Sequence, residues 1–117
     1  MMNIKVATSI TDERATFEKL GDSLIINGEV FDFSPLLEGE RLPMHAMKST
    51  LFAGYVERVD GVLTIPIRFP LSMELAQMIN GIVNPLIDVQ DGPLKLPKEP
   101  IVLPPEIAPE SPQQGGE

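Results

Sequence analysis

The chain has 117 residues, a length that predicts one domain. Its 17 acidic and 9 basic side chains give a net charge of −8, which argues against nucleic-acid and anionic membrane partners, because both attract clustered Lys and Arg. The absence of cysteine excludes disulfides and thiolate metal sites. The sequence has neither a signal peptide nor an apolar run near the ~20 residues of a membrane span, so we expect a cytoplasmic protein.

Two segments differ in composition. We expect residues 1–97 to form a single small β-rich domain. Residues 98–117 are rich in Pro, Glu, Gln and Gly, a composition that predicts a flexible, disordered tail. Within that tail, the apolar run Ile101-Val102-Leu103 could dock on a neighbouring surface.

The first two predicted strands precede a pair of tight turns. Residues Asn3–Ile10 alternate apolar and polar side chains, which is typical of a strand. Arg14–Leu20 forms a second strand after a polar connection. Gly21-Asp22 fits a II′ turn and Asn27-Gly28 fits a I′ turn, the strongest local hairpin signal.

These turns fix a register for the first meander. A two-residue loop at 27–28 pairs Leu24 with Phe31, and the loop at 21–22 pairs Phe17 with Ile26. Paired residues share one face of the sheet, so the predicted core face contains Phe17, Leu24, Ile26, Phe31 and Phe33. A one-residue slip would turn the phenylalanines outward, which is why we expect a firm register.

The meander ends at Ser34-Pro35, because proline has no N–H to donate to a ladder. Leu36–Pro43 then predicts a loop. Pro43–Lys48 predicts one helical turn.

A second hairpin is predicted over Leu51–Pro70, around Asp60-Gly61. Its predicted core face carries Phe52, Val56, Leu63, Ile65, Ile67 and Phe69. This register places Gly54 opposite Ile67 and gives Pro66 a hydrogen-bonding position that it cannot fill. Either the ladder breaks at Pro66 or Gly54 forms a bulge. Glu57-Arg58 is interpreted as a solvated hairpin end.

The remaining elements are shorter. Ser72–Asn80 predicts a helix with Ser72 as the N-cap and Gly81 at C′, although an irregular segment is the alternative. The predicted apolar stripe of this helix contains Leu75, Met78, Ile79 and Ile82. Leu86–Leu96 contains a third hairpin signal at Asp91-Gly92, and Pro93 favours an edge strand.

The elements together predict a mainly β or α+β fold, an antiparallel meander of hairpins around Gly21-Asp22, Asn27-Gly28, Asp60-Gly61 and Asp91-Gly92, with one short helix near 72–80. A small open sheet exposes its edges, which favours pairing with a protein partner or with a second copy.

The residues predict no catalytic, cofactor-binding or metal site. His45 is the only histidine, and its nearest carboxylate in the sequence, Glu40, lies in the predicted loop. A Ser-His-Asp set lacks a nucleophile-elbow sequence. Asp88-Val-Gln-Asp-Gly is spaced loosely like a calcium loop but lacks the third ligand and the closing Glu, so we interpret it as a turn.

One stretch resembles a known group of proteins. Asn27-Gly-Glu-Val-Phe-Asp-Phe-Ser-Pro-Leu36 is similar to a stretch of small, uncharacterised proteins encoded in the late, tail-gene region of tailed bacteriophages and prophages. Gly21-Asp22 precedes this stretch in the resemblance. Leu42-Pro43, Val56–Gly61, and Asp91–Leu94 with Leu96-Pro97 follow it in the same order, so that the resemblance covers most of 19–97. The chain departs from the pattern at 71–84.

The resemblance implies a non-enzymatic phage protein, either a minor tail component or an assembly factor for a tail or fibre protein. Such a protein would act through a protein partner in the bacterial host cytoplasm or in the virion. Two alternatives are a small hydrolase using His45 with a nearby carboxylate, and a self-assembling structural subunit.

Overall fold

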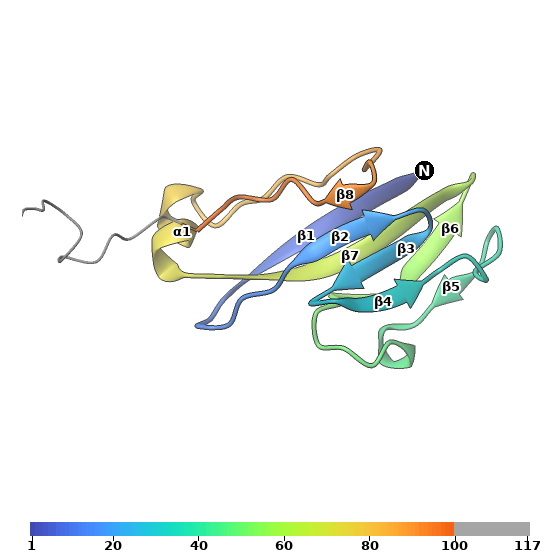
Figure 1. The fold of residues 1–117 in the computed structure, drawn as a ribbon, viewed down its shortest axis with the longest axis horizontal. Coiled ribbons are helices and arrows are strands. Elements are labelled where there is room, and N and C mark those ends of the chain that lie inside the picture. Colours follow the sequence, from blue (N-terminus) through green and yellow to red (C-terminus); the bar gives the residue numbers. More distant parts are fainter. Residues whose placement is uncertain (100–117) are drawn as a thin grey trace, which may run out of the picture.

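The computed structural model describes residues 1–99, which form two four-stranded sheets packed face to face (Figure 1). The predicted β-rich fold is confirmed. Sheet A has the strand order β1 (Met2–Ile10), β7 (Val62–Leu71), β6 (Val56–Val59) and β5 (Arg41–Leu42). Sheet B has the order β4 (Glu29–Asp32), β3 (Ser23–Ile26), β2 (Phe17–Leu20) and β8 (Gly92–Pro93).

The first meander forms sheet B in the predicted register. Leu24 lies opposite Phe31, and Phe17 lies opposite Ile26. Asn27 and Gly28 have φ values of 52° and 82°, as a I′ turn requires of both central residues. The predicted core face is buried, except that Phe31 is half-buried. Phe31 lies on β4, which is an edge strand of sheet B.

Sheet A departs from a purely antiparallel meander. Its two longest strands, β1 and β7, run parallel, with Ile4 opposite Ile65 and Val6 opposite Ile67. Parallel strands need a long crossover, and here the crossover contains three strands of sheet B. The hairpins are therefore divided between two sheets, and β1 and β7 bring together segments some sixty residues apart in the sequence.

The second hairpin is formed at Asp60-Gly61, and Arg58 lies opposite Leu63 as predicted. The ladder ends at the pair of Glu57 and Thr64, before Pro66, and the pairing beyond it is shifted, so the break and the shift that were predicted as alternatives occur together. Beyond the break, Phe52 rather than Gly54 lies opposite Ile67, so the predicted pairing there is wrong. Pro66 has no N–H to donate at this point of the ladder, and its carbonyl accepts a hydrogen bond from the Ala53 N–H at 3.0 Å.

The core lies between the two sheets and is centred on three phenylalanines. Phe52 is 1% exposed, and its ring meets the rings of Phe31 and Phe33 edge to face at centroid distances of 5.0 and 6.1 Å. Edge-to-face pairs of this kind add to the stabilisation that burial of the rings provides. Sheet A contributes Phe52, and sheet B with the residue after it contributes the other two, so this cluster joins the layers.

The short helix α1 spans Met73–Met78. Ser72 caps it as predicted, since its hydroxyl oxygen accepts a hydrogen bond from the Leu75 N–H at 3.1 Å. The predicted apolar stripe is only half right: Leu75 is buried and Ile79 is partly buried, whereas Met78 and Ile82 are exposed.

The end of α1 also differs by one residue from the prediction. Asn80, with φ 54°, occupies C′, and the Gly81 N–H closes the helix by donating to the Ala76 carbonyl at 2.8 Å. Asn tolerates the left-handed conformation, so it can take the place predicted for Gly81.

The third predicted hairpin, at Asp91-Gly92, is wrong. Leu86 instead bridges to Ile4 at the edge of sheet A, and β8 pairs with β2 in sheet B. The segment therefore connects one edge of each sheet and closes that side of the sandwich. β8 is an edge strand, as Pro93 predicts.

Glu99, the last residue that the structure describes, contacts the fold although it follows the predicted boundary at 97. The Glu99 carboxylate accepts hydrogen bonds from the Ser72 hydroxyl at 2.5 Å and from the Ser72 N–H at 3.2 Å, and it forms an ion pair with Arg14 at 3.0 Å. The rest of the predicted tail, residues 100–117 with Ile101-Val102-Leu103, lies outside the described residues.

The predicted loop 36–43 contains a short strand. β5 pairs with β6, placing Leu42 opposite Val56. The Glu38 carboxylate holds the segment before β5 against the β6–β7 turn, because it accepts hydrogen bonds from the Asp60 and Gly61 N–H groups at 2.5 and 2.8 Å. The predicted helical turn after it is present as a 3-10 helix, η1 (Met44–Ala46).

Candidate protein-interaction surface

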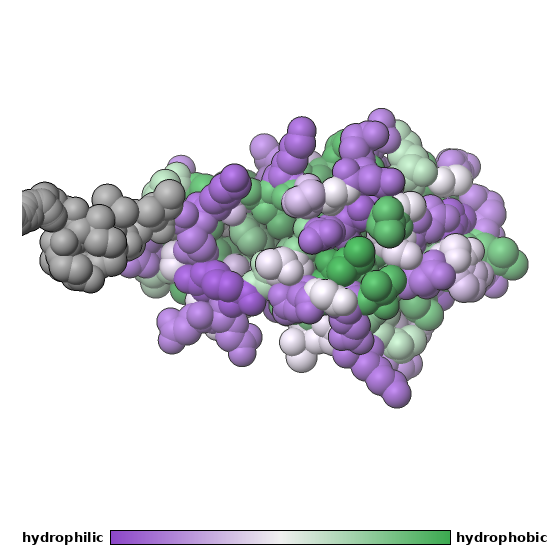
Figure 2. All heavy atoms as spheres, in the orientation of Figure 1, coloured by the Kyte–Doolittle hydropathy of each residue, from purple (hydrophilic) through white to green (hydrophobic). Residues whose placement is uncertain are grey.

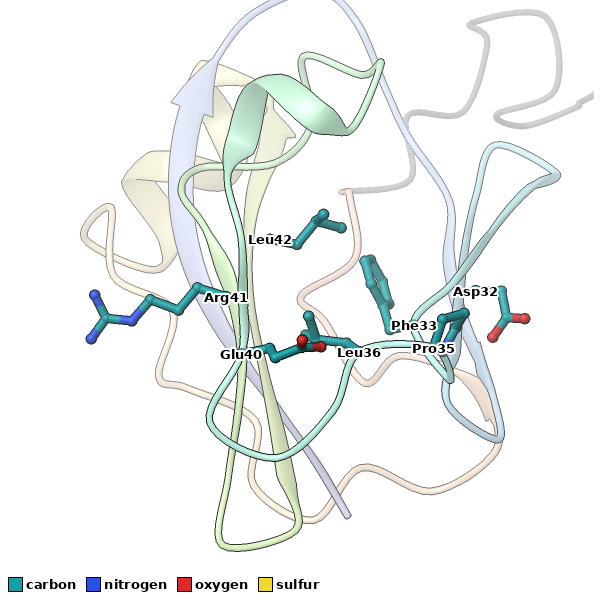
Figure 3. A pocket seen from close by; sticks show the side chains of 7 residues that line it. All are labelled: Asp32, Phe33, Pro35, Leu36, Glu40, Arg41 and Leu42. Carbon is teal, nitrogen blue, oxygen red and sulfur yellow. The ribbon is translucent and has the colours of Figure 1, made fainter.

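The side of the sandwich between β4 and β5 is open. Two neighbouring cavities of about 430 and 270 Å³ lie there. The larger is lined by Asp32, Phe33, Pro35, Leu36, Glu40, Arg41 and Leu42 (Figure 3). The smaller shares Asp32, Phe33 and Leu42 with it and adds Glu29, Phe31, Ala46, Met47 and Lys48. We call these residues together the β4 groove.

The floor of the β4 groove is apolar. Figure 3 shows Leu42 and Phe33 directed toward each other across the space between β5 and the end of β4, with Leu36 below them. Phe31 and Leu42 are only partly buried. The groove therefore exposes part of the core that elsewhere lies between two complete sheets.

Arg58 holds the groove in place, contrary to its interpretation as part of a solvated hairpin end. Its side chain is only 15% exposed. Its guanidinium donates to the Leu36 carbonyl at 2.6 Å and to the Phe33 carbonyl at 3.1 Å, and it pairs with the Asp22 carboxylate at 3.3 Å. Since Arg58 belongs to sheet A and Asp22 to a turn of sheet B, this side chain connects the two layers.

The rim of the groove is mainly acidic. Glu29, Asp32 and Glu40 are exposed, and Lys48 is the exposed cation beside them. The Arg41 side chain does not neutralise these carboxylates, because it points away from the groove (Figure 3). It forms an ion pair with Glu57, and its guanidinium lies 4.7 Å from the centroid of the Tyr55 ring.

Asp32 is held ionised at this rim. The Ser34 N–H donates to its carboxylate at 2.9 Å and the Ser23 hydroxyl at 3.4 Å. The hydrogen bonds from Ser34 in particular lower the pKa of Asp32. These hydrogen bonds therefore stabilise the ionised form of Asp32 at the rim.

One apolar area continues from the groove edge onto the outer face of sheet B. Ile25 and Val30 are cross-strand partners there, and Val30 is 60% exposed. Leu20, on β2, is also exposed, diagonally across from Ile25. Figure 2 shows hydrophobic residues over the middle of sheet B, surrounded by hydrophilic ones.

His45 lies on η1, beyond the groove, and is exposed. Within residues 1–99, no carboxylate oxygen lies within ion-pairing distance of its ring. The Glu40 carboxylate instead accepts a hydrogen bond from the Leu37 N–H at 2.7 Å. The structure does not bring together the two groups on which the hydrolase alternative depends.

The calcium-like segment also has other contacts. Asp91 pairs with Lys19 at 2.8 Å and accepts a hydrogen bond from the Gly21 N–H at 3.1 Å, so it supports the β2–β3 turn. The Asp88 N–H donates to the Asn3 side chain at 2.9 Å. The described part of the chain contains no cluster of three or more His, Asp or Glu side chains placed to hold a metal ion.

Acid is expected to destabilise the protein. The pKa values of Asp91 and Glu99 are lowered mainly by the Lys19 side chain and by the Ser72 hydroxyl, and that of Asp32 by Ser34. A lowered folded-state pKa contributes stability above the unfolded value of about 4, and this stability is lost as the pH falls through the folded-state pKa. The urea midpoint should therefore decrease below about pH 4.

The variant Asp91→Asn tests this contribution. It should have a lower urea midpoint than the unmodified chain at pH 7, where Asp91 is ionised and paired with Lys19. The two midpoints should approach each other as the pH falls through the lowered pKa of Asp91, because the protonated carboxyl, like the asparagine, carries no charge to pair with Lys19. Equal midpoints at pH 7 would contradict this role.

Comparison with family models, with curated proteins and with solved structures found no match for this chain. No helix among residues 1–99 is long and apolar enough to span a membrane.

Sequence reasoning missed the β4 groove, although it assigned Phe31 and Phe33 to the core face. The sequence did not predict strand β5, which places Leu42 on the wall opposite Phe33. A two-residue strand leaves almost no periodic signal. Within residues 36–42, the leucines at either end of a charged stretch could have indicated only that Leu36 and Leu42 pack on another part of the protein.

Proposed function

We propose that the chain is a non-enzymatic protein of a tailed phage, a minor tail component or an assembly factor for a tail or fibre protein, that acts by binding another protein. The β4 groove is the observation that supports binding. It combines an edge strand, a half-buried phenylalanine and an acidic rim, and exposed strand edges beside apolar pockets are the elements by which sheets accept protein partners.

The phage context rests on the resemblance of residues 27–36 and the three shorter stretches that follow. The stretches within residues 27–61 contribute structural elements of the groove, whereas Asp91–Leu94 contains β8, at the opposite edge of sheet B. The first contains β4 and the Phe33 and Leu36 side chains, and Leu42 lies on the opposite wall. Val56–Gly61 contains Arg58, which holds the Leu36 and Phe33 carbonyls. A host cytoplasmic site of action, with or without later inclusion in the virion, fits this proposal.

Affinity capture from cells that produce the phage tests the proposal. The tagged chain should recover one tail or fibre protein reproducibly, as identified by mass spectrometry. Its presence in purified particles would indicate a tail component, and its absence from them an assembly factor. Recovery of no virion protein, together with absence from particles, would overturn the proposed function.

A further inference from the structure

The register of sheet B determines which backbone groups β4 offers. Glu29 and Phe31 are hydrogen-bonded to Ile26 and Leu24, because the I′ turn closes on the pair formed by Ile26 and Glu29. Hydrogen-bonded and non-hydrogen-bonded pairs alternate along an antiparallel ladder. The N–H and C=O groups of Val30 and Asp32 therefore point away from β3, toward the open side of the sandwich.

The side chains beside this edge favour a single extended chain as its occupant. The smaller cavity lies between β4 and the segment Ala46–Lys48, which forms the second wall. A lone strand can lie between two walls, whereas the edge of a second folded sheet would bring its own covering segments into the same space. The groove therefore fits a peptide segment better than a second copy of the domain.

The alternation of a strand defines the chemistry of that segment. A residue opposite Phe31 would point to the apolar floor, and residues opposite Val30 and Asp32 would point to the outer face. The carboxylates of Glu29, Asp32 and Glu40 outnumber the single cation Lys48 at the rim. Asp32 is the rim carboxylate on the outer face, because Glu29 shares the face of Phe31. A segment with a basic side chain opposite Asp32 and an apolar side chain opposite Phe31 complements both features.

We propose that β4 accepts a fifth strand from another protein, an extended segment in which apolar side chains enter the groove and Lys or Arg side chains face the acidic rim. The backbone groups of Val30 and Asp32 hydrogen-bond to this segment, and Phe31, Phe33 and Leu42 contact its apolar residues. This inference deepens the proposed function and rests on it for the source of the segment.

A capped seven-residue peptide in which lysine alternates with valine is a suitable probe. Titrated into the full chain labelled with ¹⁵N, it should shift the amide signals of Val30, Asp32 and Lys48 saturably. A matched peptide with glutamate in place of lysine should bind at least about tenfold more weakly, because the acidic rim repels its carboxylates. Shifts confined to other edges, or no saturable binding of the lysine peptide, would overturn the proposal.

The variant Val30→Pro blocks the edge with little expected effect on the fold. The Val30 N–H points away from β3, and proline is tolerated at edge positions whose N–H faces solvent. We expect V30P to weaken binding of the lysine peptide about tenfold or more. Val30→Thr is the matched control, since it keeps both the N–H and the β-branched shape, and it should bind within about threefold of the unmodified chain.

Other occupants give different results. A peptide of residues 97–106 that shifts the same amides at lower concentration than the lysine peptide would assign the groove to the chain's own tail and overturn the proposal. A dimer seen by light scattering that V30P dissociates would assign the edge to a second copy, with the same consequence. The amide shifts of the unmodified chain decide the matter even where V30P fails to fold.

Affinity capture separates this inference from the proposed function. If V30P folds and still captures the tail protein that the unmodified chain captures, the groove assignment fails while the proposed function stands. If the unmodified chain captures no virion protein and is absent from particles, but binds the lysine peptide at β4, the groove assignment stands and the proposed phage function fails.

Discussion

Replacing Phe52 with alanine is expected to lower the free energy of unfolding by about 4 kcal/mol, the usual range for removing a buried phenylalanine. Phe52 is 1% exposed and is the only residue of sheet A whose ring is paired with the rings of Phe31 and Phe33 in the described part of the chain. Its removal leaves a cavity between the two layers, and the neighbouring strands cannot close it without disturbing their own pairing. Urea denaturation followed by circular dichroism measures the loss.

Two further variants keep this prediction testable. Phe52→Leu should cost about 1–2 kcal/mol, because leucine fills part of the same space, so it gives a measurable value even where the alanine variant is unfolded. Tyr55→Ala is the control, since Tyr55 is 46% exposed and should cost less than about 1 kcal/mol. Similar losses for Phe52→Ala and Tyr55→Ala would contradict the placement of Phe52 at the centre of the core.

Replacing Arg58 with methionine is expected to cost about 3 kcal/mol. The substitution keeps much of the apolar stem but removes the donors to the Leu36 and Phe33 carbonyls and the partner of Asp22. Hydrogen bonds from a charged donor contribute about 1.5–3 kcal/mol each. The substitution removes this donor from two part-buried carbonyls. The loss should appear in urea denaturation at pH 7.

Arg68→Met is the matched control for Arg58→Met. Arg68 lies on β7 with an exposed side chain and donates one hydrogen bond, to the Thr50 carbonyl at 3.2 Å. We expect it to cost less than about 1 kcal/mol. If the two substitutions cost the same, the connection between the layers through Arg58 would be refuted.

Replacing Arg58 should also weaken peptide binding in the β4 groove. Leu36 and Phe33, whose carbonyls it holds, line the larger cavity. Binding of the lysine peptide to Arg58→Met, measured under conditions where the variant is folded, should therefore weaken, whereas binding to Arg68→Met should not.

Local chemistry explains which parts of the fold were predictable. The register of sheet B follows from two turns, because Asn27 and Gly28 accept positive φ and so join adjacent strands with a fixed pairing. The hairpin at Asp60-Gly61 follows in the same way, and the break at Pro66 follows from its missing N–H. Ser72 is a cap whose partner, Leu75, lies three residues away.

Only one wall of the β4 groove could be predicted from the sequence. Phe31 and Phe33 belong to a strand whose faces the turn assigns, so their side of the groove could be deduced. Leu42 and Arg58 could not be placed, because β5 has two residues and because the partners of Arg58 lie 22 to 36 residues away in the sequence. Arg58 beside Glu57 and Asp60 has the composition of an exposed hairpin end, and only the opposing sheet covers it.

The sequence by itself determined the β-rich class, three turns and the faces of the strands they join, since these depend on φ preferences and on the two-residue period of a strand. The tertiary structure alone decided that β1 runs parallel to β7, that Gly92-Pro93 pairs with β2 instead of folding back on its own segment, and that an apolar groove stays open beside β4. These pairings join segments far apart in the chain, and the burial of both sheets' apolar faces against each other selects them.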